Sequence, residues 1–335
     1  MSERATRSHV TFMEETEMSG EIIAVKNLKK FFTTDEGVVR AVDGISFTVN
    51  EGETFGLVGE SGSGKSTTAY TLMGLYTPTQ GEITYKGIDI SIGVKDRPLR
   101  LKKEMQMVFQ DPGSSLNPKK SIQQILEVPL KVHGVSAEDR RKRVIELLHM
   151  VELPEDYLER QPTKIGGGEK QMIAIARALA TNPRFITLDE PTSALDVSMQ
   201  AKIINKLIQF QKELDLSYLF ITHNLSLMRN VASRVGIMYL GKLCEVAPTG
   251  EFFSKPLHPY TKMLLSSIPV ITDEEERVKP DKVVSRGEIP SPVNVPSGCY
   301  FHPRCNECKD ICMRNDPPMI EVEPGHFVKC HSEPL

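Results

Sequence analysis

Residues 59–66 read Gly-Glu-Ser-Gly-Ser-Gly-Lys-Ser, and this stretch decides the fold. It matches G-x-x-x-x-G-K-[ST] completely, a pattern whose glycines let backbone N–H groups point inward around a phosphate. The apolar run 55–58 precedes it, and we expect a helix from Lys65 to about Leu75. The N-terminus of that helix adds the positive end of its dipole. The stretch therefore predicts a phosphate-binding loop between a strand and a helix.

The side chains of this loop indicate a nucleoside triphosphate bound with magnesium. We expect Lys65 to reach the β- and γ-phosphates and the Ser66 hydroxyl to coordinate Mg²⁺. A plain Gly-rich turn at a helix start is the alternative, which the full match and its flanks disfavour. The expected ATP-binding residues of the loop are Gly59, Glu60, Ser61, Gly62, Ser63, Gly64, Lys65, Ser66 and Thr67.

A second apolar strand, 185–188, ends in the two acids Asp189 and Glu190. At the carboxyl edge of a parallel sheet, Asp189 can hold the Mg²⁺ shell while Glu190 faces the attacking water. An acidic pair after a strand means little by itself. In one chain with a phosphate loop, it predicts a nucleoside triphosphatase.

The remainder of the chain up to about residue 270 alternates short strands with helices. A capping box formed by Ser136 and Asp139 is expected to open one helix. Alternation of this kind favours a mostly parallel α/β sheet. Strands are expected at 21–25, 38–42, 45–49, 54–58, 185–188 and 218–222, and further helices at about 170–180 and 198–214.

Composition argues against several classes of protein. The net charge of −3 over 335 residues gives no reason to expect nucleic acid as a partner. No apolar run approaches the roughly 20 residues that a membrane-spanning helix needs. Residues 1–20 mix acids and bases without an apolar core, which excludes a secretory signal and indicates a mobile N-terminal tail. We therefore expect a cytoplasmic protein of one large domain plus an appendage.

Residues 21–270 resemble the ATP-binding cassette (ABC) ATPases, because several motifs occur in that family's order. Gln110 in MVFQDP matches the Q-loop glutamine, which in the family contacts Mg²⁺ or water and reports to membrane subunits. His223 in ITHN matches the switch histidine that contacts the γ-phosphate. Phe32 lies where the family places the ring that stacks on adenine, with a core aromatic as the alternative for Phe31 or Phe32. The family's D-loop falls on Ser193, Ala194, Leu195 and Asp196.

The resemblance implies a fold and a division of the chain. We expect an α/β ABC nucleotide-binding domain at 21–270, with a RecA-like parallel-sheet core, an antiparallel β subdomain and a helical signature subdomain at about 111–175. A Pro-rich linker and a Cys-rich C-terminal extension are expected at 271–335. The resemblance makes Glu190, His223 and Gln110 the expected catalytic residues, and Ser66, Gln110 and Asp189 the expected Mg²⁺ ligands.

The signature loop departs from the family's pattern. The family's LSGGQ is here Ile165-Gly166-Gly167-Gly168-Glu169, so a hydroxyl is missing at Gly166 and a negative charge is added at Glu169. In the family this loop closes over the phosphate loop of the other subunit. The departure therefore weakens the partner's site, on the order of 1.5–3 kcal/mol for one charge-assisted hydrogen bond. We expect a heterodimer with one better hydrolytic site.

Five of the six cysteines lie between Cys299 and Cys330. In a reducing compartment such clustering indicates metal before disulfide. Thiolates suit a [4Fe–4S] cluster or structural Zn²⁺, and Cys305 with Cys308 is spaced as half of a zinc site. A loop of reduced thiols is the remaining alternative. Cys244, alone on an expected strand, is interpreted as a buried small hydrophobe.

The C-terminal sequence resembles one branch of the family. HPYTKMLLSSIP (258–269) and GEIPSPVNVPSGCYFHPRC (287–305) look like the extension of oligopeptide/dipeptide importer ATPases, closest to the F-type subunit that pairs with a D-type one. Some members hold a [4Fe–4S] cluster there, which favours iron–sulfur over zinc. The matching cysteines are Cys299, Cys305, Cys312 and Cys330, whereas Cys308 lies outside the pattern.

These resemblances imply an ATPase that energises the import of peptides or related solutes from the cytoplasmic face of the membrane. The implied partners are a second ABC ATPase subunit, two transmembrane permease subunits and, indirectly, an extracytoplasmic solute-binding protein. A non-transport ABC ATPase in translation or repair is one alternative. A nucleotide-binding structural subunit with low turnover is another, suggested by the altered signature loop.

Overall fold

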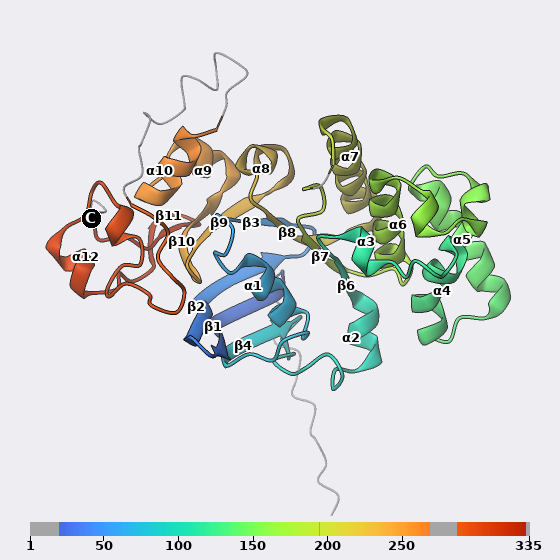
Figure 1. Ribbon diagram of the computed structural model, residues 1–335, viewed down its shortest axis with the longest axis horizontal. Helices are drawn as coiled ribbons and strands as arrows, with labels where there is room; N and C mark the ends of the chain where they lie inside the picture. The colour runs from blue at the N-terminus through green and yellow to red at the C-terminus, as the bar shows by residue number, and fades with distance from the viewer. Residues whose placement is uncertain (1–19, 194, 269–286, 333–335) are drawn as a thin grey trace, which may run out of the picture.

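The computed structural model of the protein describes residues 20–193, 195–268 and 287–332. Two β-sheets occupy the middle of the molecule, a group of helices lies at one end, and the C-terminal segment lies at the other (Figure 1). None of the described helices is both long and apolar enough to cross a membrane.

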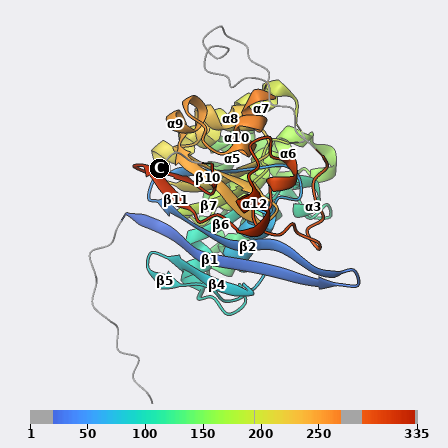
Figure 2. The same cartoon turned by 90° about the vertical axis from the view of Figure 1, so that its left-hand side faces the viewer.

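The smaller sheet is antiparallel and has the strand order β2-β1-β4-β5. Its two longest strands, β1 and β2, form an extended hairpin that reaches beyond the rest of the sheet (Figure 2). The bounds are β1 Glu21–Thr34, β2 Gly37–Asn50, β4 Gln80–Tyr85 and β5 Ile88–Asp89.

The prediction of two separate strands at 38–42 and 45–49 was wrong, because both belong to β2. Gly44, between them, has a φ of +80°, and the pairing register with β1 shifts where Leu28 gives way to Lys29. A glycine in this conformation makes a β-bulge, which bends a strand without ending it. The glycine that indicated a turn therefore marks an irregularity inside one long strand.

The larger sheet has the strand order β11-β12-β10-β9-β3-β8-β7-β6. Its central strands are parallel, with β3 between β8 and β9, and β7 between β6 and β8. Parallel strands end at one edge of a sheet, so the loops after β3, β7 and β8 meet there. The bounds are β3 Thr54–Val58, β6 Met105–Val108, β7 Phe185–Asp189, β8 Ser217–Thr222, β9 Arg234–Tyr239, β10 Lys242–Pro248, β11 Ile320–Glu323 and β12 His326–Val328.

Two apolar clusters hold these layers together, and both include β3. Between the two sheets, Phe47 stacks on Phe55 with ring centroids 5.0 Å apart. In the other cluster, Val58 is joined by Phe220 of β8 and by Leu207. The core thus fixes β3 from both faces, and with it the start of the loop that follows. The helices outside the helical group are α1 Lys65–Leu72, α2 Leu99–Glu104, α7 Val197–Leu214, α8 Leu225–Val231, α9 Thr249–Ser254, α10 Pro259–Ser266 and α12 Asp310–Arg314, with the 3-10 turn η3 His302–Arg304.

The helical group is inserted between β6 and β7. Its helix α4 begins with a complete capping box formed by Ser121 and Gln124. The capping box expected at Ser136 is only half formed. The Asp139 N–H donates to the Ser136 hydroxyl at 3.2 Å, but the Asp139 carboxylate accepts that hydroxyl instead of the Ser136 N–H. The bounds are α3 Pro112–Ser115, α4 Ile122–Val132, α5 Ala137–Met150, α6 Gly167–Leu179, and the 3-10 turns η1 Glu155–Glu159 and η2 Pro162–Lys164.

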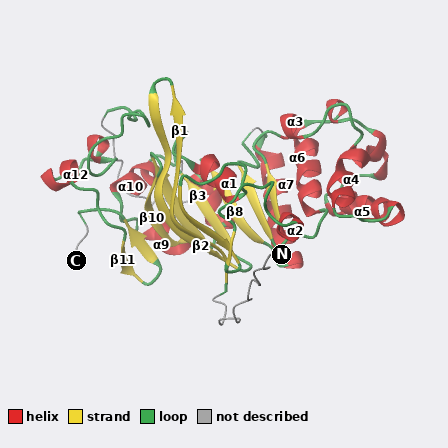
Figure 3. Ribbon diagram, turned by 90° about the horizontal axis from the view of Figure 1, so that it is seen from below, coloured by secondary structure: helices red, strands yellow, loops and turns green. Residues whose placement is uncertain are grey.

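The C-terminal segment 287–332 packs directly on the core. Its strand β12 pairs with β10 through Glu245 and Val328, which extends the larger sheet by β12 and β11 (Figure 3). The Arg40 N–H of β2 donates to the Pro292 carbonyl oxygen at 3.1 Å. Residues 287–298 form neither helix nor strand, whereas the first part of the predicted linker, up to residue 286, lies outside the described residues.

Candidate functional site

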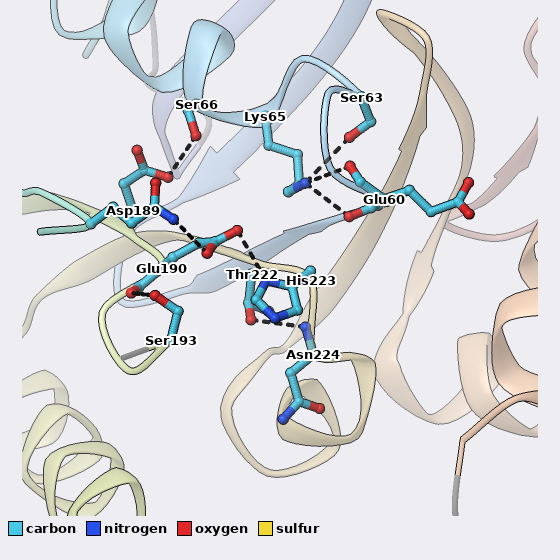
Figure 4. Close-up of polar contacts among 12 residues, drawn as sticks. Glu60, Ser63, Lys65, Ser66, Asp189, Glu190, Ser193, Thr222, His223 and Asn224 are labelled. Atoms are coloured by element: carbon cyan, nitrogen blue, oxygen red, sulfur yellow. Dashed lines mark hydrogen bonds and ion pairs between the residues drawn. The ribbon is translucent and has the colours of Figure 1, made fainter. Parts of the chain in front are cut away.

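The loop 59–66 links the end of β3 to the start of α1. Glycine is required at Gly64, whose φ is +105° and where an added Cβ would lie 2.2 Å from the Ala41 carbonyl oxygen. The Lys65 ammonium donates to the carbonyl oxygens of Gly59 and Glu60 at 2.8 and 2.9 Å (Figure 4). The lysine therefore folds back over the loop whose phosphate it is predicted to bind.

Burial lowers the pKa of Lys65, while the charges of Glu190 and Asp189 act in the opposite direction. The residue is only 5% exposed. Two carboxylates beside one buried ammonium leave this part of the site short of positive charge. Such a site favours an anionic ligand that arrives with its own divalent cation.

Asp189 ends β7 with a fully buried carboxylate, whose Oδ1 accepts the Ser66 hydroxyl at 3.0 Å. Burial raises the pKa of Asp189, while the neighbouring hydroxyls of Ser66 and Tyr70 act against that shift. Its Oδ2 is buried and lies outside the hydrogen-bonding geometry of any described residue. Mg²⁺ is usually held by one or two protein oxygens together with substrate phosphates and water. The Ser66–Asp189 pair, with one carboxylate oxygen to spare, fits that requirement.

Glu190 comes next and has a left-handed backbone, with a φ of +44°. This conformation costs of order 1–3 kcal/mol for a non-glycine residue and is typical of functional sites. The Glu190 carboxylate accepts the Gln110 amide at 2.9 Å through Oε2. Its Oε1 lies 3.1 Å from Nδ1 of His223 (Figure 4). Three predicted catalytic residues, which follow β6, β7 and β8, therefore meet at one carboxylate.

This arrangement can orient and deprotonate a water molecule. The Glu190 side chain is 13% exposed and that of His223 is 57% exposed, so the pair opens to solvent. A carboxylate held on both oxygens by neighbouring groups is fixed before any substrate binds. Chemically, the site combines a phosphate loop, a magnesium-compatible oxygen pair and a candidate general base.

The predicted D-loop is tied to the same acid. The Ser193 hydroxyl donates to the Glu190 carbonyl oxygen at 3.2 Å. Asp196 is the N-cap of α7 and accepts the Met199 N–H at 2.9 Å. Leu195 lies between them, whereas Ala194 lies outside the described residues. These contacts place the segment beside Glu190; its role toward a second subunit stays a prediction.

Phe32, near the end of β1, is the residue predicted to stack on adenine. Its ring meets Tyr76 edge-on, with centroids 5.2 Å apart, and the Lys30 ammonium lies 4.9 Å from its centroid. Phe31 instead lies near the Arg40 guanidinium. Neither phenylalanine is fully buried, which disfavours the alternative of a core aromatic. Stacking on adenine itself stays a prediction.

The signature loop 165–169 runs into α6, with Gly166 as the N-cap. Glu169 turns back on this loop: Oε2 accepts the Gly166 N–H at 2.6 Å, and Oε1 accepts the hydroxyl of Tyr157. The Tyr157 bond is the main cause that lowers the pKa of Glu169. The description of Glu169 as a charge facing a triphosphate was therefore incomplete, because its carboxylate also caps the first turn of α6.

Tyr70 is a neighbour of the site that the sequence analysis missed. It lies one helical turn after Ser66 on α1, so both side chains face Asp189. Burial and the charge of Asp189 raise the pKa of Tyr70 to about 12. The i, i+4 spacing from Ser66, the predicted magnesium ligand, was the available signal.

The metal expected in the cysteine segment is not supported. Among the described residues, no group of three or more His, Cys, Asp or Glu side chains is arranged to hold a metal ion. Burial raises the pKa of Cys299 to about 11 and that of Cys305 to about 12. Cys308 is exposed, and Cys244 is buried as expected of a small hydrophobe. The expectations of iron–sulfur and of zinc therefore remain predictions.

Comparison with known proteins gives matches over most of the chain. A family model described as "ABC transporter" matches residues 42–193, and one described as "Oligopeptide/dipeptide transporter, C-terminal region" matches residues 244–312. The oligopeptide transport ATP-binding protein AppF of Bacillus subtilis is 47% identical over 320 residues, which cover 92% of this chain and 97% of that protein.

Further similar proteins agree with these matches. The putative oligopeptide transport ATP-binding protein YkfD, also of Bacillus subtilis, is 46% identical and covers 92% of this chain and 95% of that protein. Among solved structures, the dimeric bacterial ABC transporter cassette MJ0796 aligns with a TM-score of 0.61 at 32% identity. That alignment covers 68% of this chain and 98% of the cassette.

Proposed function

The chain belongs to the ATP-binding subunits of ABC oligopeptide transporters, and from this membership we propose how its residues bind and hydrolyse ATP. It is an ATPase that energises peptide import. We assign the phosphates to the loop 59–66 with Lys65, and Mg²⁺ to Ser66, Asp189 and Gln110. The observation that carries the proposal is that Gln110 and His223 each contact one oxygen of the Glu190 carboxylate.

Hydrolysis needs a water aligned with the γ-phosphate and a group that accepts its proton. We assign both tasks to Glu190, which Gln110 and His223 orient from either side. His223 is exposed on its outer side and has room to contact the γ-phosphate. Lys65 offsets the charge on the transferred group, and Mg²⁺, when bound, neutralises the β- and γ-oxygens.

We further propose that the chain works in a heterodimer with unequal sites. MJ0796, which is similar in fold, has been solved as a dimer, and the signature loop of one cassette is expected to complete the site of the other. Here that loop has no hydroxyl at Gly166, and Glu169 is folded onto its own subunit. The better site would combine this chain's phosphate loop with the partner's signature loop.

A groove of about 340 Å³ supports docking of a transmembrane permease subunit. Strand β6 forms one wall of the groove, and Phe109, which follows the strand, also lines it. Because Gln110 comes next in the chain, a molecule bound in the groove would lie close to the catalytic centre. Lys102, which is half-buried, lines the groove together with Arg97 and Arg177, and these three residues give it positive charge. We therefore assign the groove to a cytoplasmic permease helix with one apolar and one acidic face. The apolar lining is Met73, Val94, Leu101, Met105, Met107 and Phe109.

The permease assignment predicts that Lys102→Glu reduces co-purification of the permease with the chain. Lys212→Glu, on the exposed end of α7, is the matched control and should leave it unchanged. If both variants recover the same amount of permease, the assignment of the groove to permease docking is wrong.

The remaining assignments are proposals of the same kind. We assign the nucleotide site to the domain 21–270, contact with the partner subunit to the helical subdomain 111–175, and a supporting role to the extension 271–335. The assembly would lie on the cytoplasmic face of the membrane and receive its solute from an extracytoplasmic binding protein. No step is assigned to a metal in the cysteine segment, because no group of side chains in the described part of the chain is arranged to hold one.

The nucleotide site is tested with the chain assembled with its partner and permease. Lys65→Ala should weaken MgATP binding by at least about tenfold, since it removes a charge-assisted contact with the phosphates. Glu190→Gln should keep binding and lose hydrolysis, because it keeps the shape of the side chain and removes the base. Wild-type turnover in either variant would contradict the proposed roles.

A further inference from the structure

The second residue of the phosphate loop, Glu60, is held by a residue of the cysteine segment. The Arg304 guanidinium donates to both Glu60 carboxylate oxygens, at 2.7 Å from Nη1 to Oε2 and 3.2 Å from Nη2 to Oε1. The Arg304 side chain is 7% exposed and that of Glu60 is 27% exposed. Two-point pairing of this kind fixes direction as well as distance.

A second contact reaches the same residue from α10. The Tyr260 hydroxyl accepts the Glu60 N–H at 3.1 Å and donates to the Glu60 carboxylate at 3.2 Å. Tyr260 is fully buried, so its hydroxyl has little room to move. Both the backbone and the side chain of Glu60 are thus held by residues far away in the sequence.

The Arg304 side chain is itself supported by aromatic rings. Its guanidinium carbon lies 5.6 Å from the ring centroid of Tyr239 and 5.9 Å from that of Phe301. The rings of Tyr239, Tyr260 and Phe301 pack against one another with centroids 4.8–5.3 Å apart. This cluster joins β9, α10 and the turn before η3, and it holds Arg304 toward the phosphate loop.

Glu60 matters to the nucleotide site in two ways. Its carbonyl oxygen is one of the two that accept the Lys65 ammonium, so the position of this peptide affects where the lysine lies. Its carboxylate is also an acid in a loop expected to bind a polyphosphate, and like charges repel. Arg304 neutralises that acid at its own position.

We propose that Arg304 is a positioning residue for ATP binding, through which the C-terminal segment 287–332 sets the affinity of the phosphate loop. With Tyr260 it holds the Glu60 peptide in place, and it cancels a charge that would otherwise repel the triphosphate. The inference rests on the proposed assignment of ATP to the loop 59–66.

The test measures the affinity of the full-length chain for a fluorescent MgATP analogue. Arg304→Met should raise Kd on the order of tenfold, because it leaves the charge of Glu60 in the phosphate loop without its counter-ion. Arg304→Lys keeps the charge without the two-point geometry and should give a smaller increase. Arg314→Met, an exposed arginine in the same segment, is the matched control and should leave Kd unchanged.

Rescue separates positioning from a general loss of structure. Glu60→Gln combined with Arg304→Met removes the unpaired charge, so its Kd should return to within about threefold of that of Glu60→Gln alone. A double variant as weak as Arg304→Met, or an Arg304→Met protein that binds like wild type, would overturn the proposal.

Two further variants keep the test decisive. If Arg304→Met does not fold, Tyr260→Phe removes the hydroxyl that holds the Glu60 N–H, and an unchanged Kd in that variant would also count against the proposal. Lys65→Ala serves as the reference for the site itself. A wild-type Kd in Lys65→Ala would refute the assignment of ATP to this loop, whereas a loss of binding there with no effect at Arg304 would refute only the positioning role.

Discussion

Substitution of Glu169 separates its role in holding the signature loop from the effect of its charge. In Glu169→Ala, the Gly166 N–H loses its acceptor at 2.6 Å and the Tyr157 hydroxyl loses its carboxylate partner. A first-turn cap of this kind contributes about 1 kcal/mol. A hydrogen bond to a charged group contributes about 1.5–3 kcal/mol in general, and we take a value below this range because the carboxylate is partly exposed.

The sum is roughly 2 kcal/mol of unfolding free energy, which corresponds to a fall in Tm of roughly 3 °C for a chain of 335 residues. Glu169→Gln keeps an oxygen that can accept the Gly166 N–H, so its loss should stay below about 1 kcal/mol. Thermal unfolding of the two variants beside wild type measures the difference. Equal Tm values for Glu169→Ala and Glu169→Gln would refute the capping role.

The same residue has an expected effect on activity. Glu169→Gln with Gly166→Ser keeps the loop's shape, removes a negative charge and restores a hydroxyl. In the assembled complex, ATP turnover at the partner's site should rise on the order of tenfold, the equivalent of one charge-assisted hydrogen bond. Unchanged turnover would show that the altered signature loop does not limit hydrolysis.

Three other predictions concern separate parts of the molecule. Burial lowers the pKa of His258 to about 4 from an ordinary 6.5, and its Nδ1 accepts the Tyr260 N–H at 3.0 Å. The unfolded chain therefore binds the proton more readily than the folded protein does. The contribution of His258 to the unfolding free energy is fully present above pH 6.5, and up to about 3 kcal/mol of it is lost as the pH falls to 4. Urea unfolding at pH 7 and pH 5 should show this dependence, and His258→Asn should weaken it. Phe32→Ala should weaken ATP binding about five- to tenfold with little loss in Phe32→Tyr, since stacking needs only a ring face; equal affinities would remove Phe32 from the adenine site. Anaerobic purification with iron and zinc analysis tests the cysteine segment. About one cluster per chain would support the iron–sulfur prediction, whereas the absence of both metals would mean that the cysteines are reduced thiols.

Local sequence patterns predicted which residues lie together at the candidate site. The loop 59–66, the acids 189–190 and the histidine at 223 each follow a buried strand, and parallel strands bring such positions to one edge. The ABC fold was confirmed by the family and structure matches. The i, i+3 and i, i+4 relations of helices also carry information, as the missed contact of Tyr70 with Asp189 shows.

Long-range contacts could not be read from the sequence. Glu60 and Arg304 lie far apart in the chain and pair directly, and the rings of Tyr239 and Phe301 pack beside the guanidinium. The pairing of β12 with β10, which joins the C-terminal segment to the core sheet, depends on the same tertiary packing. The capping role of Glu169 was missed, because the sequence shows its charge and not the contact with Tyr157 that directs its carboxylate.

The unequal heterodimer is tested most directly by blocking one catalytic acid at a time in the assembled complex. Steady-state ATP turnover is measured with Glu190→Gln in this chain, and then with the equivalent glutamate of the partner subunit changed to glutamine. If this chain's phosphate loop forms the better site, Glu190→Gln removes nearly all turnover, and the change in the partner leaves most of it. Equal losses, or a larger loss from the partner's substitution, would contradict the asymmetry.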